Sequence, residues 1–229
     1  MLAQAFDGTP VTSHPEVTYD PAVGTVKIHE WRLDKGVMPH DAEVSRKDGK
    51  VYMSDFMAGA LTVLDLKSGR ATMYPEPADG SPPGGYFTRI GVPPPYGLML
   101  PHTPHSLAEG KDGKFYSTDS IGCTLSEFDP KTRKYKHYAV GGGGLYPHTV
   151  RVDAKGVVWF TVIFTNQVGR FDPATGSMKV IPLPATPAGK AMLNMPSPYG
   201  IDVNPKDGSV WYAQLGIDKI GRIDADTLE

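Results

Sequence analysis

The hydrophobic residues of this chain come in short runs separated by turn signals, and the clearest example is the segment 146–184. Four apolar runs lie in it, at 148–152, 157–162, 167–172 and 177–181, and each ends near Gly, Asp, Asn or Pro. Runs of this length, rich in Val, Ile, Phe and Trp, are typical of β-strands joined by tight turns. The segment therefore predicts an antiparallel meander of four strands, which needs neighbours of the same kind to bury both of its faces.

Copies of this segment recur at 39–74, 104–138 and 198–229. Each copy opens with Pro and a ring-bearing residue, continues through a Gly-containing turn into an aromatic strand, and then has an apolar strand ending in Asp. We call the ring-bearing residues the ring residues: they are His40, His105, His148 and Tyr199. A repeat of roughly 40 residues that forms one four-stranded sheet is typical of a propeller blade. We therefore predict an all-β fold, a β-propeller of four-stranded antiparallel blades.

The repeat runs nearly end to end, so residues 1–229 are predicted to form one propeller or a piece of one. The predicted parts are the outer strand of a partial blade at 19–31, blades at 38–75, 104–139 and 146–184, and an incomplete blade at 198–229. Two arrangements fit these ragged ends. Either the N-terminal strand completes the last blade and closes a ring of four, or the chain is part of a larger propeller.

The largest departure from the repeat is the segment 75–103, which is rich in Pro and Gly. These residues are unfavourable for regular sheet pairing, so the segment is predicted to be a long loop between blades. It precedes the first strand of a blade and therefore lies on the same face as the ring residues. A loop of this length either shapes a binding site or is a tolerated surface insertion.

Composition narrows the function classes. Lys and Arg number 23 against 25 Asp and Glu, a formal net charge of -2, so no basic surface for nucleic acid is predicted. No apolar run approaches the roughly 18 residues of a membrane span. The single cysteine, Cys123, excludes an internal disulfide. The N-terminal residues MLAQAF lack the basic start and apolar length of a signal peptide, and the compartment stays open.

Equivalent positions of successive blades meet around the axis of a propeller. The ring residues are therefore predicted to surround one mouth of the central channel, with Asp55 and Asp119 near them and His102 as a further neighbour. In a pair of histidine and aspartate, the carboxylate orients the imidazole as a base, or the two side chains together hold a divalent ion. The alternative is that Pro-His is a structural blade opener whose imidazole caps a turn or bonds to the next blade.

Several motifs resemble the repeats of the virginiamycin B lyase family, also called streptogramin B lyases. The best matches are VWFT at 158–161, NQVGRFDPATG at 166–176, IPLP at 181–184 and the segment 197–226; weaker ones lie at 48–74 and 112–138. The resemblance implies a seven-bladed propeller, and hence further blades in a full-length protein. It also implies a carbon–oxygen lyase that linearises a cyclic depsipeptide by elimination at its ester bond, using Mg²⁺ and a histidine base.

Transferred to this sequence, the resemblance makes His105, His148 and His40 candidate catalytic bases and Asp119 and Asp55 candidate metal ligands. Such chemistry needs a base at an acidic C–H bond and a cation that stabilises the developing enolate-like charge. The family's active blade has a Glu two residues before the base and another at the end of the Trp-Phe strand. Here no blade has acidic residues at both positions. The residues two before the ring residues are Met38, Thr103, Tyr146 and Ser197, and the strand-end residues are Asp55, Asp119, Val162 and Gln214.

Three functions remain open on the sequence. The first is a lyase-like enzyme, and the second is a non-catalytic propeller that binds a small-molecule or peptide-like ligand at the channel mouth, or a protein partner. The third is a calcium-dependent hydrolase of the lactonase type. That enzyme would need oxygen ligands converging on one ion, for which Asp55, Asp119 and Asn194 are the candidates.

Overall fold

A computed structural model of the chain describes residues 29–33, 36–184, 197–217 and 219–229. The chain divides into two compact units, Met1–Arg32 and Leu33–Glu229, and all described strands belong to the second. Of the strand predicted at 19–31, residues 19–28 lie outside the described residues.

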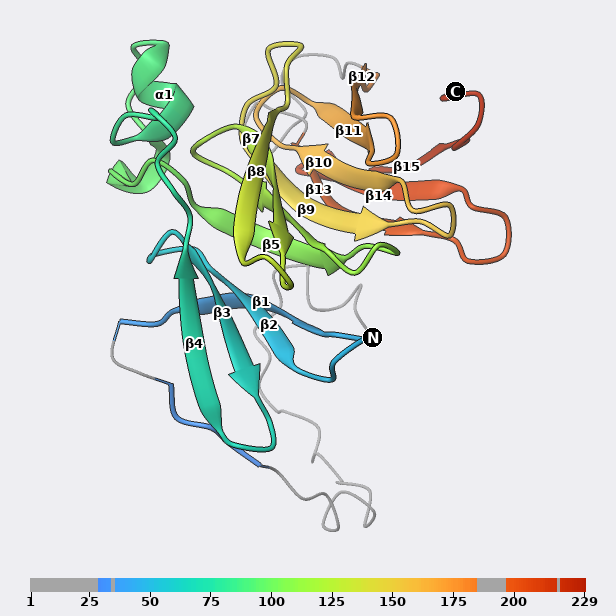
Figure 1. Ribbon diagram of the computed structural model, residues 1–229. Helices are drawn as coiled ribbons and strands as arrows, with labels where there is room; N and C mark the ends of the chain where they lie inside the picture. The colour runs from blue at the N-terminus through green and yellow to red at the C-terminus, as the bar shows by residue number, and fades with distance from the viewer. Residues whose placement is uncertain (1–28, 34–35, 185–196, 218) are drawn as a thin grey trace, which may run out of the picture. The chain divides into compact units, whose positions relative to one another are not determined.

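The described strands form four antiparallel sheets, and each sheet consists of consecutive strands in simple order (Figure 1). The first sheet contains β1 (Pro39–Val44), β2 (Val51–Asp55), β3 (Ala60–Asp65) and β4 (Arg70–Pro75). The second contains β5 (Pro104–Glu109), β6 (Phe115–Asp119), β7 (Thr124–Asp129) and β8 (Lys134–Ala139). The third contains β9 (Pro147–Val152), β10 (Val158–Val162), β11 (Gln167–Asp172) and β12 (Ser177–Pro182). The fourth contains β13 (Ser197–Val203), β14 (Val210–Leu215) and β15 (Lys219–Ile223).

The first strand of each sheet contacts the first strand of the next, so that β1 contacts β5, β5 contacts β9 and β9 contacts β13. Successive four-stranded meanders that pack through their inner strands are blades of a β-propeller. The predicted fold class is therefore confirmed. Over the described residues the blades form an open series and are not closed into a ring.

Burial changes from the inner to the outer strands of a sheet. Every residue of β10 is buried, whereas β12 alternates between exposed and partly buried residues. Inner strands are covered on both faces by the neighbouring sheets, so they carry nearly continuous apolar sequence, while the outer strand has one face in water. In the third sheet this difference accompanies the sequence: β10 is VWFTV, whereas β12 is SMKVIP.

The core consists of apolar clusters between neighbouring sheets. Phe160 packs with Tyr116 and Val150 between the second and third sheets, and Trp159 packs with Ile201 and other residues of the fourth sheet. Trp211 occupies in β14 the position that Trp159 has in β10, yet it is 43% exposed. It faces the side of the fourth sheet on which no further described sheet lies.

A repeated hydroxyl group connects each sheet to the next. Thr118 in β6 accepts a hydrogen bond from the backbone N–H of Ser106 (3.2 Å) and donates one to the carbonyl of His148 in the next sheet (2.5 Å). Ser54 makes the same two bonds, to the N–H of Asp41 (3.0 Å) and to the carbonyl of His105 (2.7 Å). The third member, Thr161, bonds the N–H of Thr149 (3.1 Å) and the carbonyl of Tyr199 (2.9 Å). Each hydroxyl thereby satisfies two backbone groups at an inner strand.

The long segment between β4 and β5 is docked on the sheets and contains a short helix, α1 (Gly85–Arg89), and a 3₁₀ turn at Pro95–Gly97. Phe87 and Leu98 are buried in a cluster with Ile121 and Tyr146. The N–H of Tyr86 also donates to the carbonyl of Ile121 (3.0 Å). This segment therefore covers one end of the second and third sheets. We call it the covering loop.

No helix in the described part of the chain is long and apolar enough to cross a membrane.

Glycine at the third strand makes room for an aromatic ring from the second strand of the same sheet. Phe160 is paired with Gly169, and Tyr212 is paired with Gly221 in the same register of the fourth sheet. A methyl group added to either glycine would overlap the neighbouring ring. The repeated glycine is therefore a packing requirement of these two sheets.

We expect Gly169→Ala to lower the free energy of unfolding by about 1–3 kcal/mol, because Phe160 must move within a fully buried cluster. Gly200→Ala is the matched control, since a methyl group there meets no atom within 4 Å, and we expect a change within about 0.5 kcal/mol. Urea unfolding followed by tryptophan fluorescence measures both. Equal stability of the two variants would contradict this packing argument.

Candidate functional site

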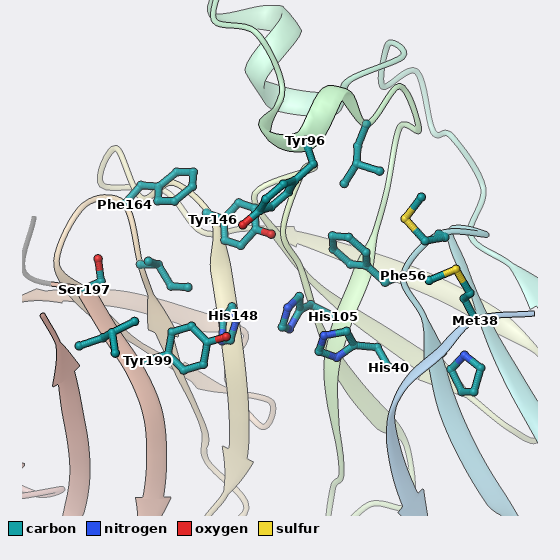
Figure 2. Close-up of a pocket in the computed structure, with 15 residues that line it drawn as sticks. Met38, His40, Phe56, Tyr96, His105, Tyr146, His148, Phe164, Ser197 and Tyr199 are labelled. Carbon is teal, nitrogen blue, oxygen red and sulfur yellow. The ribbon is translucent and has the colours of Figure 1, made fainter. Parts of the chain in front are cut away.

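An apolar cavity of about 620 Å³ lies at the end of the sheets where the ring residues are found (Figure 2). All four ring residues line it. The covering loop contributes Tyr96 and Leu98, and the connections next to the inner strands contribute Tyr146, Phe164 and Phe56. A concave, mostly apolar space with a few polar groups is the usual form of a small-molecule site.

The ring residues project into the cavity because each lies in a β-bulge. Pairing between the first and second strands shifts register between Pro39 and Ala42, and the same shift occurs between Pro104 and Leu107. The third and fourth sheets show it at the same place. A bulge re-aims the side chains of the strand that contains it. The hydroxyl groups of Ser54, Thr118 and Thr161 hold the backbone of these bulges.

The rings of the four residues form a continuous row across the sheets (Figure 2). The ring centroids of His40 and His105 are 3.9 Å apart, those of His105 and His148 are also 3.9 Å apart, and those of His148 and Tyr199 are 4.1 Å apart. The rings are tilted by 42–48° from one neighbour to the next. The ring residues thus lie side by side, as the repeat predicts. A catalytic role for them stays a prediction.

The two central imidazoles are buried, and neither forms a salt bridge with another described residue. His105 is 8% exposed and His148 is 5% exposed. Burial, and then the neighbouring His40, lower the pKa of His105 to about 4. Burial and the neighbouring His105 lower the pKa of His148 to about 3. Both imidazoles are therefore uncharged at neutral pH and present a lone pair on one ring nitrogen.

Their hydrogen bonds differ. Nδ1 of His148 is 2.9 Å from the hydroxyl oxygen of Thr149, which orients the ring. Nδ1 of His105 is buried and has no hydrogen-bond partner among the described residues. His40 is more exposed, and its Nδ1 is 3.3 Å from Asp41 Oδ1.

Aromatic residues that the sequence analysis did not single out as site residues form the upper wall of the cavity. Tyr146 and Phe164 are stacked with their centroids 4.7 Å apart, and Tyr96 projects from the covering loop above the imidazoles (Figure 2). Tyr96 is 83% exposed and has a left-handed backbone with φ of 58°. The sequence signal that could have identified it is Pro-Pro-Tyr-Gly at the tip of a long loop, since such tips often carry binding residues.

Asp55 and Asp119 lie outside the cavity lining and hold the backbone at the ends of β2 and β6. Oδ1 of Asp119 accepts from the N–H groups of Thr103 (2.7 Å) and Gly122 (3.0 Å). Asp55 Oδ1 accepts in the same way from Met38 (3.1 Å) and Ala58 (3.2 Å), and its buried Oδ2 has no partner among the described residues. A metal-binding role for these two residues stays a prediction.

The described lining lacks the side chains that Mg²⁺ requires. This ion prefers carboxylate and water oxygens in octahedral arrangement. None of the described residues that line the cavity is an aspartate or a glutamate. The described lining therefore does not fit Mg²⁺. His102 does not line the cavity either; its Nδ1 is 2.5 Å from Asp119 Oδ2 at the base of the covering loop.

No protein-family model matches the sequence, and a search of curated proteins finds no significant match.

Solved structures do resemble the fold. A catalytically inactive histidine-to-alanine variant of virginiamycin B lyase from Staphylococcus aureus, with quinupristin, has a TM-score of 0.68 and 23% identity, covering 88% of this chain and 58% of that one. A streptogramin B lyase structure has a TM-score of 0.62 and 24% identity over 82% of this chain and 51% of that one. A 6-phosphogluconolactonase-like protein from Bacteroides uniformis has a TM-score of 0.58 and 14% identity, covering 83% and 55%.

These similarities confirm, at the level of the fold, the predicted resemblance to the streptogramin B lyases. The chain spans between half and three fifths of the length of these three structures. The propeller fold is shared with lyases and with lactonase-like proteins alike, so the fold does not select one activity.

We expect His105 and His148 to remain uncharged in the native protein at pH 5, where histidines of the urea-unfolded chain, with a pKa near 6.5, are mostly protonated. The unfolded chain then binds more protons than the native chain, so these two residues lower the free energy of unfolding as the pH falls from about 6.5 to about 4. NMR titration of the imidazole C–H resonances measures the native pKa values. Native titration of both residues near pH 6.5 would contradict the prediction.

Proposed function

We propose that the cavity binds the apolar or aromatic groups of a ligand, and that His148 or His105 removes a carbon-bound proton from it in a carbon–oxygen lyase reaction. The observation that carries the proposal is the pair of buried, uncharged imidazoles, His105 and His148, in the wall of an apolar cavity. A charged group placed inside the cavity would lose its hydration without gaining a counter-charge from the described lining, so any charged group of the ligand is expected to stay in solvent. The activity and substrate of the whole protein belong to the proposal.

The reaction has simple requirements. An imidazole takes the proton from the carbon next to a carbonyl group, the electron pair forms a carbon–carbon double bond, and the ester C–O bond breaks with release of a carboxylate. A pKa of about 3 or 4 keeps the imidazole unprotonated but makes it a weak base. Negative charge that develops on the ligand beside the imidazolium raises its proton affinity during the reaction.

His148 is the better placed base. The hydroxyl of Thr149 fixes its Nδ1, and an oriented base loses less freedom when it reacts. His105 and Tyr199 stand on either side of it and restrict the position of a ligand. No step is assigned to Mg²⁺, because the described lining offers it no carboxylate.

A binding function without catalysis is the second candidate. It is favoured by that same lack of acidic side chains in the described lining, because the base then has no electrophilic partner for the developing charge. A lactonase-type function has less support: Asp55 and Asp119 both bind backbone amides, and Asn194 lies outside the described residues.

We expect the protein to linearise quinupristin, and His148→Ala to slow the reaction at least about 100-fold because it removes the general base. Chromatography with mass spectrometry separates the candidates: elimination gives a linear product of unchanged mass, whereas hydrolysis adds one water. Parallel reactions contain Mg²⁺, Ca²⁺ or EDTA. His29→Ala is the control, since His29 belongs to the other unit of the chain.

Binding of intact quinupristin without any product would support the second candidate and overturn the lyase proposal. Equal rates for the wild type and His148→Ala would exclude His148 as the base.

Tyr96 is expected to contribute to ligand affinity by stacking. We expect Tyr96→Ala to weaken binding of quinupristin, or of an uncharged naphthylamine probe, about tenfold, and Tyr96→Phe to retain it. Tyr86→Ala is a matched control because Tyr86 belongs to the covering loop but does not line the cavity. Since Tyr96 is 83% exposed, its loss is expected to leave the thermal stability unchanged. Wild-type affinity in Tyr96→Ala would contradict the role.

A further inference from the structure

A second group of ionisable side chains lies at the base of the covering loop, away from the cavity lining. Glu76 follows β4 directly, His102 lies shortly before β5, and His137 projects from the outer strand β8. The first two residues are the start and the end of the covering loop. One cluster therefore joins both ends of the loop to the second sheet.

The three side chains are close together and buried. Oε2 of Glu76 is 3.6 Å from Nε2 of His137 and 4.0 Å from Nδ1 of His102. One ligand atom from each residue lies within 4.8 Å of those of the other two. The side chains of Glu76, His102 and His137 are 0%, 2% and 10% exposed.

Two atoms of this cluster have unused hydrogen-bonding capacity. Oε1 of Glu76 and Nε2 of His137 are both buried and have no hydrogen-bond partner among the described residues. Within the described part of the chain, the other carboxylate oxygen of Glu76 accepts one hydrogen bond, a long one of 3.4 Å from the hydroxyl of Ser126. Buried polar atoms are nearly always paired, so a missing partner indicates an ion or a water at this place.

Carboxylates orient both imidazoles from outside the cluster. Nδ1 of His137 is 2.9 Å from Oδ2 of Asp79, and Nδ1 of His102 is 2.5 Å from Oδ2 of Asp119. When a neutral histidine donates from Nδ1, its lone pair is on Nε2, which in His137 is the atom facing Glu76. A carboxylate behind a histidine is the usual support of a metal-ligating imidazole.

We propose that Glu76, His102 and His137 form a binding site for a divalent transition metal, with Zn²⁺ as the ion that fits best. One carboxylate and two imidazoles suit Zn²⁺, whereas Mg²⁺ and Ca²⁺ prefer an all-oxygen shell. Tetrahedral bonds of about 2.0–2.1 Å place ligand atoms about 3.3 Å apart, so the 3.6 Å separation between Glu76 Oε2 and His137 Nε2 needs to close by only about 0.3 Å. His102 would contribute its Nε2 atom, because its Nδ1 atom is held by Asp119. A water molecule completes the shell.

One rearrangement is needed. The rings of His102 and His137 are stacked, with centroids 4.2 Å apart and planes only 7° apart, so one of them must tilt before both lone pairs reach the same ion. His102 can turn about its Nδ1 bond to Asp119, because the contact of its Nε2 with the carbonyl of Ala78 is long, at 3.3 Å. Ala78 belongs to the covering loop and moves with it.

The consequence of binding is mechanical. An ion at this place would connect the two ends of the covering loop to β8, and the same loop carries Tyr96 and Leu98 into the cavity. The metal would therefore stabilise the cavity mouth without touching a ligand there. This site does not depend on which reaction the cavity performs.

The test is calorimetric titration of the EDTA-treated full chain with Zn²⁺ alone, and separately with Mg²⁺ and Ca²⁺. We expect one equivalent of Zn²⁺ to bind, and the affinity to fall at least about tenfold in Glu76→Gln and in His137→Gln. His148→Ala is the matched control, because it removes a buried histidine of the cavity and is expected to leave the affinity unchanged. Circular dichroism without metal establishes that each variant is folded.

Absence of Zn²⁺ binding to the folded wild type would overturn the proposal, as would unchanged affinity in whichever of the two variants folds. A readout that needs no variant is Co²⁺ substitution. Tetrahedral coordination gives intense visible absorption bands, and the weak bands of a six-coordinate ion would contradict the proposed ligand set. Equal loss of binding in His148→Ala would place the ion in the cavity instead and would also overturn the proposal.

Discussion

The arrangement of the inner strands depends on a hydroxyl group that serves two sheets at once. Each of these hydroxyl groups accepts a hydrogen bond from a backbone amide in the bulge of its own sheet. It donates a hydrogen bond to the carbonyl of a ring residue in the next sheet. The three residues are Ser54, Thr118 and Thr161. Both backbone groups would otherwise be buried without a partner, which is costly in a protein interior. Because the same bond sets the bulge and the spacing between sheets, it also sets the row of rings.

The electrostatic character of the cavity follows from that row. Burial disfavours protonation of His105 and His148, and the neighbouring imidazoles act in the same direction. These two side chains are thus kept uncharged by their place in the fold. At the base of the covering loop the imidazoles do have acidic neighbours: His102 contacts Asp119, and His137 contacts Asp79. One loop therefore spans an uncharged site at its tip and a charged cluster at its ends.

The sequence predicted most of the fold, because strand lengths and turns depend on residues close together in the chain, and the repeat shows that the same sheet recurs. The repeat also predicted that the Pro-His positions would meet. It did not predict the hydroxyl contacts, since one Ser or Thr in a strand looks the same whether it binds a neighbouring sheet or faces solvent. Asp55 and Asp119 show the same limit: the sequence marks them as acidic, but only the fold shows that their Oδ1 atoms accept backbone amides. The cluster of Glu76 and His137 joins residues far apart in sequence, and nothing in the repeat marks them as a pair.

The hydroxyl bonds act on the backbone carbonyl groups of the ring residues, a group that every residue type has. His105, His148 and Tyr199 all receive the same bond although their rings differ. The bond between sheets therefore stays the same whether the side chain is an imidazole or a phenol. The chemistry of the cavity wall can thus differ from one sheet to the next while the backbone contact that joins the sheets is repeated.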